Sequence, residues 1–416
     1  MSLVRLSLFR TSAGVDSLLP LRWISRWLKP PARARLWRFL ALFVARRHGM
    51  RRSRSRASGS APSGGCFDLL LVSDALFPER GGGTRSLMQV ARRLVAAGRK
   101  VAGVCQGPER RRFTVGGIEI HWIPDGAELA GFMRATPARR MVVQQAWAPV
   151  AAEAARAAGL PYWYFARSTE EFIEESGDAF DEVQLATAIR AATDARALAT
   201  SAVVAGAERV VANSRFMARL MRGAFGREAD VLYPEVDEPM PWEKRRDPIA
   251  RGILAVATTN KKGVGIMFEL AKAFPREQFL LCGFKPLTRY RNMLLDERTV
   301  RNIVPLGRLP TPATYALAKL VLVPSQWPEP FGRVNAEALL RGIPVLASRV
   351  GGIPEIVTDE SLLIADFKNP EAWAERLRDL RRPSVLRAVR PAVVESAATY
   401  SRLLGENEAL IGHLVR

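Results

Sequence analysis

The sequence has 416 residues, three cysteines, three histidines and a formal net charge of +21 at pH 7. The length predicts two or three domains. The scattered cysteines Cys66, Cys105 and Cys282 lack metal-ligand spacing and are odd in number, which argues against a disulfide framework or a zinc site and favours a reducing compartment. Three histidines leave little room for a histidine-based metal site.

The positive charge is concentrated at the N-terminus. Residues 1–60 contain fourteen lysines and arginines and a single acid, Asp16, so they hold +13 of the net charge and leave +8 for the other 356 residues. A basic tract can bind nucleic acid, but no nucleic-acid-binding motif accompanies this one. Nucleic-acid binding is therefore the least favoured function, and the excess charge belongs to an extension rather than to the folded body.

Two tryptophan- and leucine-rich patches lie in this extension, at 17–30 and 34–50. One interpretation is a pair of short amphipathic helices on an anionic membrane surface. There are two alternatives: the extension is a disordered tail, or the chain starts at Met50. The sequence leaves all three interpretations open. The apolar run 39–45 is too short to span a bilayer. Residues 51–65 are predicted to be a low-complexity linker that does not fold.

The first globular segment opens with the apolar run 67–74, which is typical of a buried strand. A loop with Gly81, Gly82 and Gly83 follows, and then a helix and a second strand. Glycines let the backbone approach a ligand closely, and Thr84 is predicted to cap the helix. The G-x-G-x-x-G spacing of dinucleotide-binding folds is missing, so an ordinary tight turn is an equally simple interpretation of the loop by itself.

Strands and helices then alternate along the chain. Apolar runs predict strands at 117–123, 140–145, 161–167, 252–258 and 279–284, and the stretch 171–207 is predicted to be helical. The segment 208–226 predicts a strand and then a helix, and Ser214 is predicted to cap that helix. The proline-rich, charged segment 239–248 marks a domain boundary. This alternation predicts an α/β protein with two doubly wound, Rossmann-like parallel sheets.

The stretch 321–357 contains the strongest chemical pattern of the chain. A short strand at 321–323 ends at Pro324 and Ser325, a loop leads to a helix at 333–341, and a second strand starts at 344. Gly351 and Gly352 then open another loop-to-helix junction. In open parallel sheets, ligands bind beyond the carboxyl ends of the strands, and phosphates bind at helix N-termini. We therefore expect a phosphate-containing ligand at this edge.

Two carboxylates, Glu329 and Glu337, lie in this stretch with seven residues between them. Acidic side chains are unsuitable partners for phosphate, but a carboxylate accepts two hydrogen bonds from adjacent sugar hydroxyls. Backbone N–H groups around Phe331, Gly332 and Arg333 can receive an anion at the start of the helix. A ligand with phosphates in the middle and a sugar at each end, a nucleotide-sugar, satisfies both requirements.

The whole stretch resembles the signature of glycosyltransferase family 4. It contains, in order, the Pro-Ser strand end, Trp-x-Glu-Pro-Phe-Gly, Glu-x7-Glu, Gly-x-Pro-Val and Gly-Gly-x-Pro-Glu. A lone Glu-x7-Glu is a weak signal, because any solvated helix can offer two such glutamates, but this context makes it specific. The resemblance implies the GT-B fold, in which two Rossmann-like domains face a cleft. It also implies retaining transfer of a hexosyl group from a nucleotide-diphosphate sugar to a glycan or lipid-linked acceptor.

The resemblance further implies roles for individual residues. Glu337 holds ribose hydroxyls, Glu329 contacts the donor sugar, and Lys262 neutralises the leaving diphosphate. The donor-binding residues that it implies are Gly81, Gly82, Gly83, Lys261, Lys262, Gly307, Arg308, Leu309, Glu329, Pro330, Phe331, Gly332, Arg333 and Glu337. The catalytic residues are Glu329, Lys262 and Arg167, and no metal or cofactor is expected, because the lysines and the glycine loop take the place of a divalent cation.

The chain departs from the family pattern at two positions. The family usually has a histidine after the strand at 161–167, where this chain has Arg167. The family also has an arginine before the Lys-Gly pair. Here Lys262 and Gly263 match that pair, but only Lys261 is near the place of the arginine, and lysine lacks the bidentate fork of arginine. A surface arginine and a solvated lysine are the simplest alternative interpretations of Arg167 and Lys261.

The expected organisation is an extension and linker at 1–65, an acceptor domain at 66–240, a donor domain at 241–385 and a C-terminal helix at 386–416 that returns to the first domain. We expect a cytoplasmic enzyme, peripheral on the inner face of the plasma membrane if residues 17–50 contact an anionic surface. The alternative function is a catalytically degenerate nucleotide-sugar-binding or scaffold protein. A nucleotide-sugar 2-epimerase is disfavoured by the intact Glu-x7-Glu.

Overall fold

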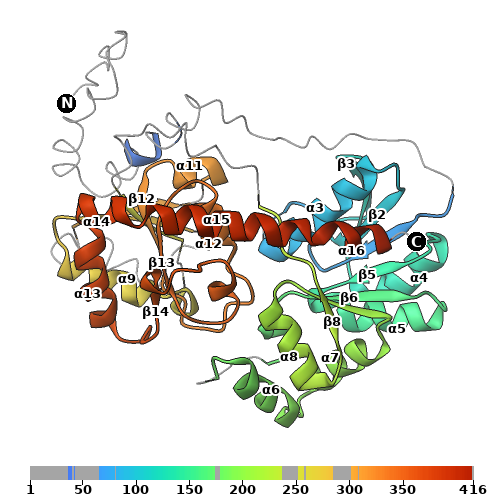
Figure 1. Cartoon of the computed structure of the whole chain (residues 1–416). Helices are drawn as coiled ribbons and strands as arrows, with labels where there is room; N and C mark the ends of the chain where they lie inside the picture. The colour runs from blue at the N-terminus through green and yellow to red at the C-terminus, as the bar shows by residue number, and fades with distance from the viewer. Residues whose placement is uncertain are drawn as a thin grey trace, which may run out of the picture.

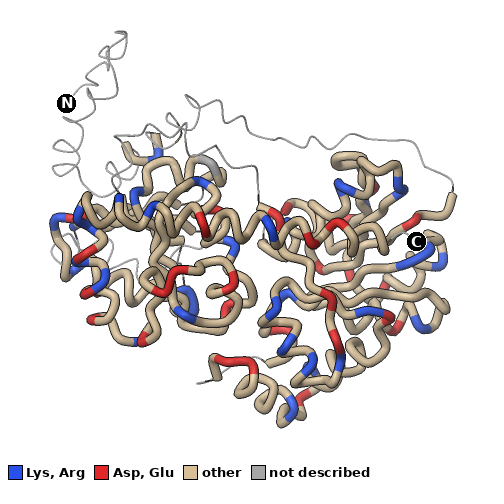
Figure 2. The backbone as a smooth tube through the Cα atoms, in the orientation of Figure 1, with Lys and Arg blue, Asp and Glu red and all other residues tan. Residues whose placement is uncertain are grey.

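The computed structural model describes residues 36–39, 42, 65–79, 81–173, 179–236, 252–256, 259–283, 301–307 and 309–414. Figure 1 shows two α/β halves side by side, with the last two helices of the chain running from one half to the other. Figure 2 shows acidic and basic residues interspersed along both halves. The predicted boundary segment 239–248 and Arg308 lie outside the described residues.

The first half is built on an eight-stranded sheet with the order β3-β4-β2-β1-β5-β6-β7-β8. All neighbouring strands are parallel except β3 and β4. The strands are β1 Leu69–Val72, β2 Val101–Gln106, β3 Arg111–Val115, β4 Ile118–Ile123, β5 Met141–Val143, β6 Tyr162–Ala166, β7 Arg209–Ala212 and β8 Ala229–Val231. The central strands β1, β5 and β6 are buried along their whole length, as continuous apolar runs in a parallel sheet require.

Helices cover both faces of this sheet (Figure 1). They are α3 Gly82–Ala96, α4 Leu129–Ala135, α5 Ala148–Ala157, α6 Glu182–Ala191, α7 Ala195–Gly206 and α8 Arg215–Phe225. The prediction of one helical stretch at 171–207 is wrong, because Asp181 and Asp194 each cap a separate helix. The prediction for Ser214 is confirmed, since its side chain accepts a hydrogen bond from Met217 N.

The second half is built on a six-stranded, fully parallel sheet with the order β11-β10-β9-β12-β13-β14. The strands are β9 Gly252–Ala255, β10 Gln278–Cys282, β11 Ile303–Gly307, β12 Ala318–Val323, β13 Val345–Ser348 and β14 Leu363–Ile364. The helices are α9 Val264–Ala273, α11 Thr311–Tyr315, α12 Arg333–Leu339, α13 Pro370–Leu380 and α14 Pro383–Ala388. The two observed sheets confirm the predicted fold class.

The last two helices, α15 Arg390–Gly405 and α16 Asn407–His413, run from the second half back to the first (Figure 1). Leu410, Ile411 and Leu414 are buried in the same core cluster as β1 and β2 of the first sheet. Asn407 exchanges two hydrogen bonds with the backbone of Tyr233, at 3.0 and 2.9 Å. Helix α16 is therefore a structural part of the first half, whereas Val393, Tyr400 and Leu403 of α15 belong to the core of the second half.

A short helical segment of the basic extension, residues 36–39, packs on the second half. Trp37 is 5% exposed and belongs to that half's hydrophobic core, and Arg38 Nη1 donates to Leu306 O at 2.5 Å. The membrane-surface interpretation of the extension included Trp37, and the structure instead places this side chain in the protein interior. None of the helices in the described ranges combines the length and the apolar composition that crossing a bilayer requires.

Candidate functional site

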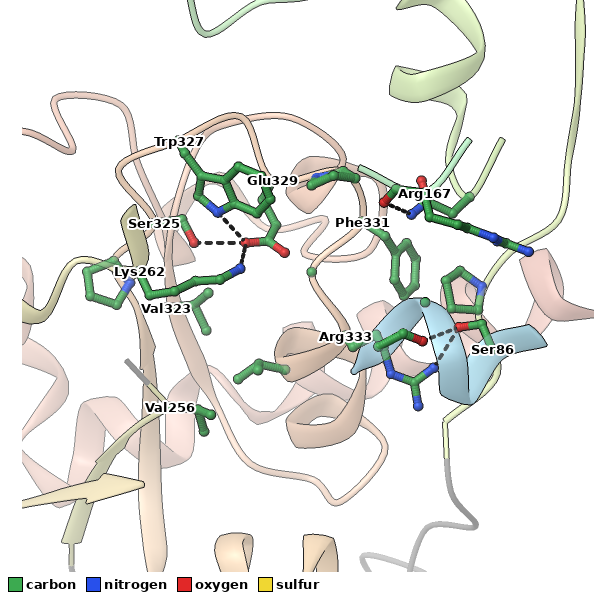
Figure 3. A pocket seen from close by; sticks show the side chains of 18 of the residues that line it. Ser86, Arg167, Val256, Lys262, Val323, Ser325, Trp327, Glu329, Phe331 and Arg333 are labelled. Atoms are coloured by element: carbon green, nitrogen blue, oxygen red, sulfur yellow. Dashed lines mark hydrogen bonds and ion pairs between the residues drawn. The ribbon is translucent and has the colours of Figure 1, made fainter. Parts of the chain in front are cut away.

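A cavity of about 330 Å³ lies between the two halves, at the carboxyl ends of strands from both sheets. The first half contributes the start of α3 and Arg167, and the second half contributes Lys262 and the loop from β12 to α12. Figure 3 shows two polar groups on opposite sides of Phe331: Lys262 with Glu329 and Trp327 on one side, and Arg167 with Arg333 on the other. This is the edge at which parallel α/β sheets bind ligands.

The first polar group is organised around the carboxylate of Glu329. Lys262 Nζ lies 2.5 Å from Glu329 Oε2 and 4.5 Å from the centroid of the Trp327 ring. The same oxygen accepts hydrogen bonds from Trp327 Nε1 at 2.9 Å and from Ser325 Oγ at 3.3 Å. One oxygen of Glu329 therefore has three partners from its own chain.

Two glycines allow the backbone segments of this group to approach each other. Gly263 has a φ of +70°, and a Cβ at this position would lie 1.7 Å from Pro324 O. Gly351 has a φ of +58°, and its Cβ would lie 2.1 Å from Glu329 O. Only glycine fits at such positions. The Lys-Gly pair and the Gly-Gly-x-Pro-Glu segment therefore hold the loop that carries Glu329.

Glu337 is 7% exposed and does not line the cavity. Its Oε2 accepts a hydrogen bond from Tyr315 Oη at 2.7 Å, and its Oε1 lies 3.8 Å from Arg333 Nη2. Burial, and then the negative charge of Glu337, hold the pKa of Tyr315 well above its ordinary value. Tyr315 is therefore a neutral donor that orients the carboxylate.

Arg167 follows β6 and is 6% exposed. Its guanidinium lies 4.5 Å from the centroid of the Phe165 ring, and Nη1 donates to Leu232 O at 3.4 Å, whereas Nε and Nη2 have no hydrogen-bond partner. Burial lowers the pKa of Arg167 to about 9; the nearby charge of Arg333 also lowers it, and Glu171 opposes the shift. A buried guanidinium with unpartnered N–H groups is unusual and indicates a constraint other than stability.

Arg333 connects the two halves. From the first turn of α12, its Nη1 donates to Ser86 Oγ of α3 at 3.1 Å and to Glu235 O at 2.6 Å. Further contacts between the halves involve Glu355, whose carboxylate accepts hydrogen bonds from the backbone N–H groups of Arg215 and Phe216 at the start of α8, at 2.9 and 2.6 Å. Negative charge at a helix N-terminus is favourable, so this contact stabilises the observed arrangement of the halves.

The structure brings most of the predicted site residues together. The predicted residues that line the cavity are Gly82, Gly83, Arg167, Lys262, Glu329, Pro330, Phe331, Gly332 and Arg333. Gly81, Gly307, Leu309 and Glu337 lie outside its lining, and Lys261 pairs instead with Glu170 at 2.7 Å. Arg308 lies outside the described residues.

The predicted cap of α3 is wrong. Gly81 is the N-cap residue and provides no side-chain hydrogen bond, while Thr84 Oγ1 donates to Ala75 O at 3.0 Å. The hydroxyl therefore ties the helix to the start of the loop after β1 and leaves the first turn of α3 without a side-chain cap.

Sequence reasoning also missed polar residues of the first half. Glu171 is half-buried and accepts hydrogen bonds from Tyr164 Oη at 2.7 Å and from the backbone N–H groups of Gln145, Arg167 and Ser168. Burial raises the pKa of Glu171 to about 7, although these donors oppose the shift. The capping-box spacing Ser168-x-x-Glu171 is a local signal for Glu171, but its contacts with Tyr164 and Gln145, like the position of Gln145 itself, depend on partners from other strands.

Two family models match the chain. The model described as "Glycosyl transferase 4-like domain" matches residues 81–233, and the model described as "Glycosyl transferases group 1" matches residues 251–388. The first match covers most of the eight-stranded half, and the second covers the six-stranded half with Lys262, Glu329 and Glu337.

Curated relatives match over shorter stretches. Spore coat protein SA of Bacillus subtilis is 39% identical over 71 residues, which are 17% of this chain and 19% of that protein. The D-inositol 3-phosphate glycosyltransferase of Mycolicibacterium smegmatis is 30% identical over 234 residues, which are 50% of this chain and 52% of that protein. The chain thus spans at most about half the length of these two relatives.

Solved structures match the fold over most of the chain. Sucrose-phosphate synthase of Thermosynechococcus elongatus has a TM-score of 0.67 at 16% identity and covers 83% of this chain and 98% of its own. HepE of Anabaena, solved in complex with UDP and glucose, has a TM-score of 0.63 at 17% identity and covers 84% of this chain and 99% of its own. At these identities the likeness establishes the two-sheet architecture alone.

Proposed function

Because the chain belongs to the GT-B glycosyltransferases of the family 4 type, we propose that it transfers a hexosyl group, with retention, from a nucleotide-diphosphate sugar to a glycan or lipid-linked acceptor. The observation that carries this proposal is the cavity between the sheets, where Lys262 and Glu329 face the start of α12. A lysine for a leaving phosphate and a carboxylate for sugar hydroxyls lie within one site.

In this proposal the donor binds mainly to the second half. Glu329 accepts hydrogen bonds from hydroxyls of the donor sugar, and the backbone from Phe331 to Arg333 receives the phosphates at the uncapped start of α12. Glu337 holds the ribose hydroxyls, which requires Arg333 to move, since its Nη2 lies 3.8 Å from Glu337 Oε1. The buried Tyr315 keeps the carboxylate in place while this exchange occurs.

Catalysis is proposed to be electrostatic. Lys262 leaves Glu329 and pairs with the diphosphate as the bond from the anomeric carbon to the phosphate oxygen breaks. The oxygen of the acceptor hydroxyl forms the new bond to the anomeric carbon and its proton passes to the departing diphosphate, while the carboxylate of Glu329 turns to the sugar. Enclosure between the halves excludes bulk water and strengthens these interactions. No enzymic nucleophile is proposed.

The known relatives support the donor class. HepE was solved with UDP and glucose, and several relatives are named as glycosyltransferases. A cytoplasmic location, peripheral at the membrane through residues 17–50, and the domain limits at 65, 240 and 385 remain proposals.

The test of the donor site is thermal-shift binding of UDP, GDP and ADP and of their sugars, without metal. Selective stabilisation by one nucleotide is expected, and Glu337→Ala is expected to abolish it because the ribose loses its carboxylate partner. Glu375→Ala, which changes an exposed glutamate of α13, is the matched control. Stabilisation by no nucleotide, or equal stabilisation of both variants, contradicts the assignment.

A degenerate nucleotide-sugar-binding protein is the second candidate. The absence of the family's usual histidine and arginine favours it, as does the engagement of Lys261 by Glu170. Tight nucleotide binding without any hydrolysis or transfer of the bound nucleotide-sugar would support this candidate over the enzyme.

A further inference from the structure

A short segment of the basic extension is docked in the second half. Trp37 is 5% exposed and belongs to the core of that half, and Leu36 and Leu42 pack against the same core. Trp37 Nε1 is buried and has no hydrogen-bond partner among the described residues, so packing rather than a polar contact holds the indole. We call residues 36–39 and 42 the strap; Figure 1 draws residues 36–39 as the short blue helix.

The strap lies on the corner where β11 ends. Arg38 Nη1 donates a hydrogen bond to Leu306 O at 2.5 Å, and a Cβ on Gly307 would lie 2.7 Å from the same nitrogen. Gly307 has a φ of +61°, so the chain leaves the strand through a left-handed turn that favours glycine. This corner is at the carboxyl edge of the second sheet, the edge at which parallel sheets bind ligands.

Other side chains fix the carbonyl groups that follow in this corner. Gly307 O accepts a hydrogen bond from Cys282 Sγ at 3.1 Å. Thr314 Oγ1 donates to Pro310 O at 3.2 Å. Both of these donors belong to the second half itself, whereas Arg38 is 268 positions away from its acceptor in the sequence. The path of the chain from β11 to α11 therefore depends in part on the extension.

Helix α11, Thr311–Tyr315, begins directly after this corner. A helix of five residues is not stable by itself, so its position depends on what it packs against. Its last residue, Tyr315, shares the core cluster of Trp37 and donates the hydrogen bond that orients Glu337. A shift of the corner therefore moves the tyrosine hydroxyl relative to the carboxylate.

We propose that the strap is a positioning element of the donor site: Trp37 and Arg38 hold the corner after β11 and thereby the helix α11, whose tyrosine orients the ribose carboxylate. In the proposed glycosyltransferase function, on which this assignment rests, that carboxylate is Glu337. Part of the basic extension thus acts inside the protein and sets donor affinity through residues that do not touch the donor.

The first test is the dissociation constant of UDP, GDP and ADP, measured by titration calorimetry on the full chain without metal, at a temperature at which every variant is folded. The nucleotide that binds the wild type is expected to bind about tenfold more weakly to Trp37→Ala and to Arg38→Ala, because the ribose carboxylate loses its oriented donor. Measurement on folded protein separates this loss from any fall in melting temperature.

Two variants control for a merely structural effect. Trp37→Phe keeps an aromatic anchor and removes no hydrogen bond, since no described residue bonds to Nε1, so its nucleotide affinity is expected to stay within about twofold of the wild type. Arg227→Ala removes the same kind of contact in the first half, where the half-buried Arg227 donates to Ala207 O at 2.6 Å. Its nucleotide affinity is expected to equal that of the wild type.

A double mutant tests whether the strap acts through α11. Tyr315→Phe already removes the contact that the strap supports, so adding Arg38→Ala to it is expected to weaken nucleotide binding further by less than about twofold. Independent effects would instead multiply, and a second loss of about tenfold would overturn the proposal, because the strap would then act elsewhere.

Hydrogen exchange of the α11 amides gives a readout that needs no nucleotide. Exchange at residues 311–316 is expected to be faster in Arg38→Ala than in the wild type, while exchange in β1 stays the same. Arg227→Ala is expected to exchange at 311–316 as the wild type does.

Wild-type nucleotide affinity in both Trp37→Ala and Arg38→Ala overturns the proposal, as does wild-type exchange of α11 in Arg38→Ala. A failure of the proposed function is a different result, because no nucleotide then binds the wild type. The exchange measurement still decides in that case whether the strap positions α11.

Discussion

The two walls of the cleft differ in how their polar groups are paired. On the wall from the second half, Glu329 is held by Lys262 and Trp327, and Glu337 is held by Tyr315. On the wall from the first half, Gln144 and Arg167, among others, have buried atoms without any hydrogen-bond partner. The second wall also has unpaired buried atoms, Arg333 Nη2 and the side-chain Nδ2 and Oδ1 of Asn335. The difference is that its two carboxylates are paired, whereas Arg167 on the first wall is under-paired.

This difference implies two modes of ligand binding. A ligand at the paired carboxylates of the second wall exchanges partners with groups that are already oriented, so its affinity is the difference between two sets of interactions. A ligand at the under-paired Arg167 of the first wall supplies partners that the protein lacks, and each new hydrogen bond relieves an existing cost. The predictions below test this contrast, from the largest expected effect to the smallest.

Lys262→Ala is expected to reduce the rate of donor hydrolysis by about 100- to 1000-fold, the loss typical of one electrostatic contact to a leaving group. The melting temperature should change little, because the Lys262 side chain is 38% exposed. Lys272→Ala, on the solvent side of α9, is the control and should retain the wild-type rate. A loss of less than about threefold in Lys262→Ala would remove this lysine from the chemistry.

Glu171 is the well-paired exception on the first wall, and its titration should be visible in stability. Its pKa of about 7 in the native state is above the ordinary value of 4.5, so the native state holds the proton more tightly. The stabilisation is complete below pH 4.5 and is lost as the pH rises to 7, a difference of about 3 kcal/mol. The free energy of unfolding in urea, measured from pH 5 to pH 8, should fall with pH in the wild type and not in Glu171→Gln. The same pH dependence in both proteins would refute the raised pKa.

Tyr315→Phe leaves one oxygen of the buried Glu337 without its donor. The free energy of unfolding should fall by about 2 kcal/mol, because the lost hydrogen bond is to a carboxylate. Tyr162→Phe is the matched control, since Tyr162 Oη donates to the uncharged carbonyl of Val203 and its loss should cost about 1 kcal/mol. If urea unfolding gives the same loss of free energy of unfolding for Tyr315→Phe and Tyr162→Phe, the hydrogen bond from Tyr315 to Glu337 is no stronger than one to an uncharged carbonyl.

Arg167→Met should not lower the free energy of unfolding, in contrast to Tyr315→Phe. Replacing an under-paired buried charge by an apolar side chain of similar length is expected to leave stability unchanged or raise it by about 1 kcal/mol. Arg341→Met provides the contrast, because the buried Arg341 donates to Glu337 O at 2.7 Å and its removal should destabilise. If urea unfolding shows that both variants are destabilised alike, the two walls do not differ as described.

The sequence was most informative where chemistry and backbone geometry are local. The expected strand, loop, helix and strand at 321–347 appear as β12, α12 and β13, because proline and glycine limit each element within a few residues. Within the described residues, most of the predicted donor set from this stretch lines the cavity.

The remaining features depend on partners far apart in the chain. Gln145 is fixed by Ser73, 72 residues away, and Glu355 binds the start of α8, 139 residues from Phe216. Such pairings are set by strand order, which one sequence does not encode locally. Thr84 was mispredicted for a similar reason, since the carbonyl of Ala75 competes with the helix for its hydroxyl.

The return of α16 to the first sheet has a consequence for biosynthesis. The half that leaves the ribosome first keeps Leu410, Ile411 and Leu414 in its core, and Arg140 beside β5 donates to the carbonyls of His413 and Leu414. Domains generally fold as they emerge during synthesis. Here the earlier half can complete its core only after residue 414 has been released from the exit tunnel, so until then the apolar surface that α16 covers is exposed to chaperones.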